Sequence, residues 1–133
     1  MSNYTRTLVY LSEGVHPTNT VDCTQTGTTL LTRTQTATES GAQFNPLQVF
    51  IKIFGVNGVT VPAVISIGTN DPDFNNIVDG QTIDGPARMM QVTAAMATPL
   101  NQLPVDTDIM INVTTAATAT SLNLRAGVIG IVV

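Results

Sequence analysis

One segment of the chain carries oxygen-bearing side chains at the spacing that opens a calcium-binding loop. Its four candidate ligands are Asp71, Asp73, Asn75 and Asp79. A loop of this type also needs a glycine at its sixth position and a bidentate glutamate at its twelfth. Asn76 and Thr82 occupy those two positions. We therefore expect an Asx/Pro turn that caps a hairpin, with a structural calcium site as the alternative.

The other reactive side chains lack the partners that catalysis requires. Asp106 and Asp108 stand two residues apart before an apolar strand, where carboxylates are typical gatekeepers against aggregation. Cys23 is the only cysteine and His16 the only histidine, and neither belongs to a recognisable nucleophile–base motif. We predict no enzymatic activity and no cofactor, and we expect Cys23 to be a small apolar residue at the edge of a packed region.

The composition favours contact with other protein subunits. Charged residues make up 11% of the chain, against about 25% in ordinary soluble domains, while threonine occurs 22 times. A polar surface with few charges costs less to desolvate than a charged one, which suits burial against a neighbour. The net charge is −4, no apolar run reaches 18 residues, and the five basic residues are scattered along the chain: Arg6, Arg33, Lys52, Arg88 and Arg125. Nucleic-acid binding and a membrane span are therefore not expected.

The elements that carry these residues are predicted to be β-strands. Helical periodicity is nearly absent, β-branched residues dominate, and Pro and Gly divide the chain into short segments. This pattern predicts an all-β protein, an antiparallel β-sandwich or jelly-roll-like domain. We expect residues 42–133 to form the sandwich core and residues 1–41 to form an extended polar N-terminal arm.

The arm is predicted to contribute more to assembly than to folding. Its central strand carries alternating threonines and has no oily face, so its register is weakly specified. This strand is expected to be a sheet edge, an arm over the domain, or an arm that reaches a neighbour. The candidate interface residues in it are Thr32, Thr34, Thr36 and Thr38.

Alternating apolar residues predict the core strands. Asn57-Gly58 predicts a two-residue hairpin after the strand that contains Ile51. Residues 114–121 are interpreted as a second hairpin tip, and Gly127 and Gly130 as bulges in the last strand. The apolar C-terminal end must be covered inside the sheet or in an oligomer, because an exposed apolar strand aggregates. Its candidate interface residues are Ile129, Ile131 and Val133.

The C-terminal region resembles a known structural family. The strand D-I-x-I-x-V-T-T-A at Asp108–Ala116, followed by a Thr/Ala tip and a strand ending at Val133, is similar to the closing hairpin of small virion proteins of tailed bacteriophages. A polar arm before a jelly-roll-like core also resembles capsid cement, or decoration, proteins. The resemblance implies a location on the capsid surface of the virion, a homotrimer, and the major capsid protein as partner.

Two structural roles and one enzymatic role remain as hypotheses. The first is a capsid cement protein that binds between major capsid subunits and stabilises the shell. The second is a tail, baseplate or fibre-tip module that binds host glycans. Glycan sites use aromatic platforms, and this chain has no Trp and two Tyr, which disfavours that role. The absence of a catalytic motif disfavours an enzyme.

Overall fold

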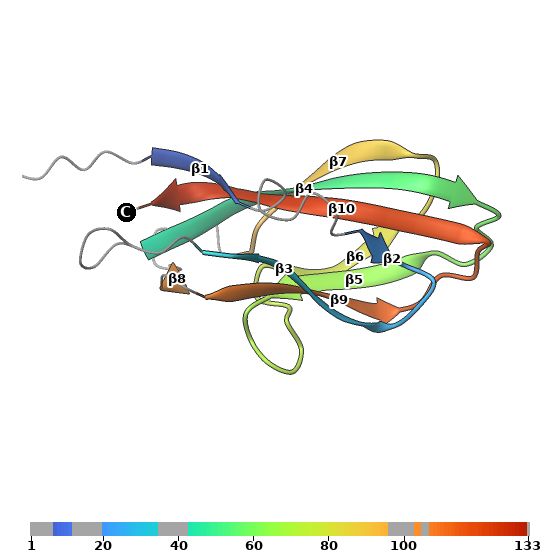
Figure 1. Ribbon diagram of the computed structural model, residues 1–133, viewed down its shortest axis with the longest axis horizontal. Coiled ribbons are helices and arrows are strands. Elements are labelled where there is room, and N and C mark those ends of the chain that lie inside the picture. The colour runs from blue at the N-terminus through green and yellow to red at the C-terminus, as the bar shows by residue number, and fades with distance from the viewer. Residues whose placement is uncertain (1–6, 12–19, 35–42, 96–102, 105–106, 133) are drawn as a thin grey trace, which may run out of the picture.

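The computed structural model describes residues 7–11, 20–34, 43–95, 103–104 and 107–132, which form β-strands and their connections (Figure 1). Within these residues there is no helix, and hence none long and apolar enough to cross a membrane. The strands are β1 Thr7–Leu11, β2 Val21–Asp22, β3 Gly27–Arg33, β4 Gln43–Asn57, β5 Ala63–Gly68, β6 Val78–Ile83, β7 Arg88–Thr93, β8 Leu103–Pro104, β9 Asp108–Thr115 and β10 Ser121–Val132.

The strands form two antiparallel sheets that pack face to face. The first sheet has the order β1-β10-β4-β7, with β2 added to β10 and β8 added to β4. The second sheet has the order β3-β9-β5-β6. The two layers lie one above the other in Figure 1. The predicted all-β sandwich is therefore confirmed.

The core lies between the sheets, and buried residues alternate with outward ones along several of the strands. In β9, the buried Ile109, Ile111 and Val113 alternate with polar or half-buried neighbours, as predicted. Each isoleucine that is fully removed from water stabilises the fold by about 1.5–3 kcal/mol. The matching buried residues of the first sheet are Val49, Ile51 and Ile53 in β4 and Leu122, Leu124, Ala126 and Val128 in β10.

The C-terminal strand is covered inside its own sheet. β10 lies between β1 and β4 and pairs with both, so Val128 has partners on its two sides. Of the two alternatives left open by the sequence, coverage inside the sheet or in an oligomer, the structure adopts the first. The register between β10 and β4 shifts between Ile129 and Gly130, so a bulge lies beside Gly130 as predicted, but its extra residue is Leu47 of β4. Gly127 pairs with Phe50 and lies at no register shift, so the bulge predicted there is wrong.

Both predicted hairpins are wrong, because each of these connections crosses between the sheets. β4 belongs to the first sheet and β5 to the second, while β9 belongs to the second and β10 to the first. Gly58 does adopt the positive φ expected of a turn, at 65°. A positive φ reverses the chain but does not decide which strand the returning chain pairs with. The two crossings meet instead, where Thr118 bridges Val61.

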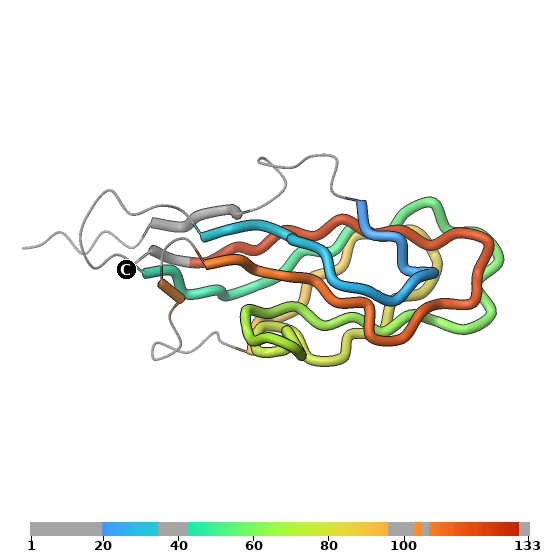
Figure 2. The backbone as a smooth tube through the Cα atoms, turned by 60° about the horizontal axis from the view of Figure 1, so that its bottom comes forward, coloured from blue at the N-terminus to red at the C-terminus, as the bar shows by residue number. Residues whose placement is uncertain are grey.

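The predicted boundary at residue 41 does not separate an arm from the sandwich in the described residues. β1 and β2 pair with β10, and β3 pairs with β9 at the edge of the second sheet. Figure 2 shows the blue-to-cyan chain of β2 and β3 running beside the orange and red strands. Thr32, the first residue of the predicted threonine strand, lies in β3 at the edge of the second sheet, and residues 35–38 of that strand lie outside the described residues.

Candidate interaction surface

The segment with calcium-loop spacing is the turn of the β5–β6 hairpin. The side-chain oxygen of Asn70 accepts hydrogen bonds from the backbone N–H groups of Asn75 and Asn76, at 2.9 and 3.1 Å. The Asn70 amide also donates to the side-chain oxygen of Asn75 at 2.7 Å, which occupies one predicted ligand. Asp71, Asp73 and Asp79 are exposed, and the described residues contain no group of three or more His, Cys, Asp or Glu side chains placed to hold a metal.

Two of the threonines assigned to an interface are buried within the chain. The register of β3 against β9 shifts between Leu30 and Thr32, so Leu31 is an extra residue in the strand. The resulting bulge turns both Leu31 and Thr32 inward, and Thr34 then also points inward. Thr32 is 1% exposed and Thr34 is 2% exposed. Neither presents its side chain to a partner, which corrects the prediction for these two residues.

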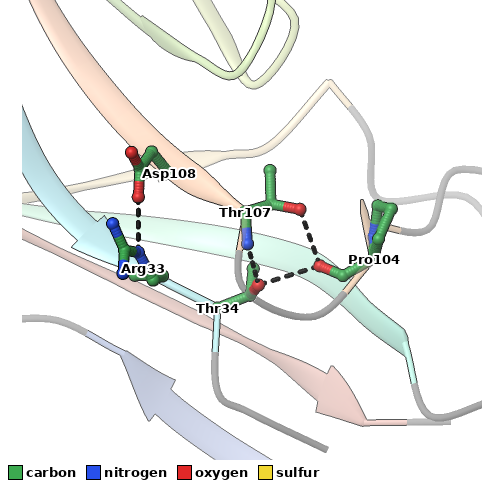
Figure 3. A network of polar contacts seen from close by, with 5 residues as sticks. All are labelled: Arg33, Thr34, Pro104, Thr107 and Asp108. Atoms are coloured by element: carbon green, nitrogen blue, oxygen red, sulfur yellow. Dashed lines mark hydrogen bonds and ion pairs between the residues drawn. The ribbon is translucent and has the colours of Figure 1, made fainter.

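Thr34 joins the end of β3 to the start of β9 through a closed set of hydrogen bonds (Figure 3). Its hydroxyl donates to the carbonyl oxygen of Pro104 and accepts from the N–H of Thr107, both at 2.8 Å. The hydroxyl of Thr107 donates to the same carbonyl at 2.8 Å. Beside this network, Arg33 forms an ion pair with Asp108 at 2.6 Å. Thr34 therefore stabilises the subunit itself.

The other predicted interface residues divide into two groups. Thr36, Thr38, Val133 and the side chain of Ile131 lie outside the described part of the chain. Ile129 is half-buried and pairs with Gln48 of β4. Among the predicted interface residues whose side chains are described, Ile129 is the one that is not buried in the core. It lies on the outer face of the first sheet.

That outer face gathers side chains that sequence reasoning did not connect. Residues at alternate positions of β4 point away from the core and meet outward residues of β7 and β10. Met89, opposite Lys52, is 61% exposed and is one of the two large exposed hydrophobic residues among those described. We call this surface the basic–aromatic face and define it by Phe50, Lys52, Phe54, Met89 and Arg125.

Two cations face each other at its centre. Lys52 and Arg125 are directly opposite in the β4–β10 register. The ion pairs found in the described part of the chain are Arg33–Asp108 and Arg88–Asp84, so neither involves these two cations. The Arg125 guanidinium lies 5.4 Å from the centroid of the Phe54 ring, and its Nε donates to the Thr20 hydroxyl at 3.3 Å. Lys52, Phe54 and Arg125 line a shallow depression of about 170 Å³.

Cys23 is a packed core residue, as its surroundings show. Its side chain is fully buried, and burial raises the pKa of its thiol to about 12, with a smaller contribution from the charge of Asp22. Its backbone N–H donates to Leu122 and its carbonyl accepts from Ala117, each at 2.8 Å. The thiolate that nucleophilic chemistry needs is therefore suppressed at neutral pH.

A larger surface depression, of about 450 Å³, lies at the end of the sandwich where the chain crosses between sheets. The residues that line it are Val56, Val59, Thr60, Pro62, Asp84 and Gly85. Asp84 is the titratable side chain among them, and Arg88 binds it at 3.2 Å. General acid–base chemistry would need a second titratable group in this depression.

Comparison with known proteins identifies the fold. No protein-family model matches the chain, and no curated protein shows significant sequence similarity to it. Among solved structures, a chain of the "Cyanophage Pam1 capsid asymmetric unit" has a similar fold, with a TM-score of 0.62 and 14% sequence identity. The similarity covers 98% of this chain and 89% of that chain, so the two are of similar length. At this identity, the similarity establishes the fold.

Proposed function

We propose that this protein is a structural component of a phage virion, a cement (decoration) protein on the capsid surface that binds between major capsid subunits and stabilises the shell. The observation that carries the proposal is the similarity of nearly the whole chain to a chain of similar length from a cyanophage capsid. The role is structural and not enzymatic.

The surface chemistry supports a role in attachment. Few charges have to be desolvated, and the outer face of the first sheet carries the exposed Met89 and the half-buried Phe50 and Phe54. Aromatic, Met and Arg side chains are enriched in protein–protein interfaces. The known partner of a cement protein is the major capsid protein, and we propose the same partner here.

The test is reconstitution on empty shells. Shells assembled from the matching major capsid protein alone are incubated with the purified chain, pelleted, and imaged by electron cryomicroscopy. We expect stoichiometric density at the junctions between capsid subunits and a higher shell melting temperature. Density confined to the tail or baseplate of intact virions, with bare shells, would instead support the tail-module alternative.

A further inference from the structure

We propose that the basic–aromatic face is the surface that attaches this protein to the shell, and that its occupant is a carboxylate-bearing surface of the shell protein. The proposal rests on the proposed function and names the contact that function requires. It is carried by the juxtaposition of two cations and two aromatic rings on one outward sheet face.

The strand register places two positive charges side by side, which destabilises the isolated subunit. Lys52 and Arg125 are directly opposite on adjacent antiparallel strands, at the distance where like charges repel. The chain has a net charge of −4, and six of its nine acidic residues lie in the described part of the structure. None of these six forms an ion pair with Lys52 or Arg125. A carboxylate between the two would turn this repulsion into attraction.

Arg125 is held in a position suited to such a carboxylate. Its guanidinium lies over the Phe54 ring, and its Nε is engaged by Thr20. Stacking and the Nε bond restrict the side chain before any partner arrives. The terminal nitrogens have no partner in the described part of the chain, and they form the two-pronged side of the guanidinium that binds carboxylates.

The surrounding apolar surface supplies the burial that a charge contact alone lacks. Phe50 is half-buried beside Gly127, and Met89 extends the face over β7. Exposed ion pairs contribute little in water, but they strengthen when neighbouring apolar groups exclude solvent. The face therefore has an apolar rim around a cationic centre, which complements an acidic segment flanked by apolar residues.

The proposal commits to the shell protein rather than to a second copy of this chain. Asp71 and Asp73, two of the chain's exposed carboxylates, lie in the β5–β6 turn, which projects from the far side of the second sheet in Figure 1. A contact between these two faces of identical subunits would close into a ring only for particular rotations and would otherwise propagate as a filament. The shell protein requires no such closure, and it is the partner that the proposed function supplies.

The experiment compares two variants of equal net charge on the same empty shells. K52Q/R125Q removes both cations, and T28E/T82E adds two carboxylates at exposed positions of the second sheet, so each changes the net charge from −4 to −6. We expect K52Q/R125Q to bind at least about tenfold more weakly than the wild type, and T28E/T82E to bind within about twofold of it. Wild-type binding should weaken with NaCl, and this salt dependence should disappear in K52Q/R125Q.

Stability separates attachment from folding. Relief of the Lys52–Arg125 repulsion should offset the loss of the Phe54 stacking and the Thr20 bond, so the melting temperature of K52Q/R125Q should stay close to that of the wild type, whereas a structural role would lower it. If wild-type protein binds and K52Q/R125Q binds equally well, this inference is overturned and the proposed function stands. If wild-type protein does not bind shells, both are overturned. If K52Q/R125Q instead changes the oligomeric state in light scattering with shell binding intact, the face joins copies of this chain and the inference is overturned.

Discussion

Two threonine hydroxyl groups near the end of β3 have opposite consequences for stability. The Thr32 hydroxyl is buried and has no hydrogen-bond partner in the described residues, while the Thr34 hydroxyl makes two hydrogen bonds. An unsatisfied buried hydroxyl costs about 1–3 kcal/mol, and a satisfied one stabilises. T32V should therefore raise the free energy of unfolding by about 1 kcal/mol, and T34V should lower it by about 1–3 kcal/mol. Urea denaturation of both variants measures the difference, and a loss of stability in T32V would contradict it.

Gly130 is required because two parts of β4 approach it closely. A Cβ at this position would meet the backbone oxygen of Asn45 and the ring of Phe44, which is itself buried. A backbone oxygen cannot rotate away as a flexible side chain can. We expect G130A to lower the free energy of unfolding by about 2–3 kcal/mol, the upper range for overpacking. A wild-type melting temperature would show that the bulge moves to accommodate the methyl group.

The Cys23 thiol predicts a loss of stability at alkaline pH. Its pKa is raised from 9.0 to about 12 in the folded chain. Above pH 9 the unfolded chain therefore releases a proton that the folded chain retains, which favours unfolding. The contribution is fully present below pH 9 and falls by at most about 1.4 kcal/mol per pH unit above it. Comparing the wild type with C23A in urea at about pH 8 and about pH 10.5 measures it, because C23A should lose less stability between the two.

At the scale of elements, β1 covers the outer edge of the C-terminal strand β10. It pairs with β10 from Leu11–Val128 to Thr7–Val132. This pairing argues against the expectation that the N-terminal segment contributes more to assembly than to folding. Deleting residues 1–11 should lower the melting temperature and expose the edge of β10, which then aggregates in a concentration-dependent manner. Analytical ultracentrifugation over a range of concentrations checks this, and a soluble monodisperse deletion variant with unchanged melting temperature would restore the arm interpretation.

At the scale of the whole molecule, we predict a homotrimer. The apolar C-terminal strand no longer supports this prediction, because β1 and β4 cover it. The shortage of charge and the resemblance to cement proteins still do. Multi-angle light scattering should give three times the chain mass of 14.0 kDa, and a monodisperse monomer at micromolar concentration would contradict it.

The local alternation of apolar and polar residues was sufficient to predict which face of an individual strand points into the core. The alternation in β9 and β10 identified the residues that point into the core, and the β-branched composition identified a sandwich. The turn at Asp71 was also readable, because Asn and Pro side chains act on their own neighbouring backbone. These features depend on contacts within a few residues, which sequence records directly.

Pairing between distant strands was decided only by the folded chain. The bulge at Leu31 that buries Thr32, the crossing after Gly58, and the juxtaposition of Lys52 with Arg125 all depend on which strands become neighbours. Many pairings satisfy the same alternation, since any apolar face packs against any other. The choice among them comes from filling one shared core without voids, and that condition applies to all strands at once.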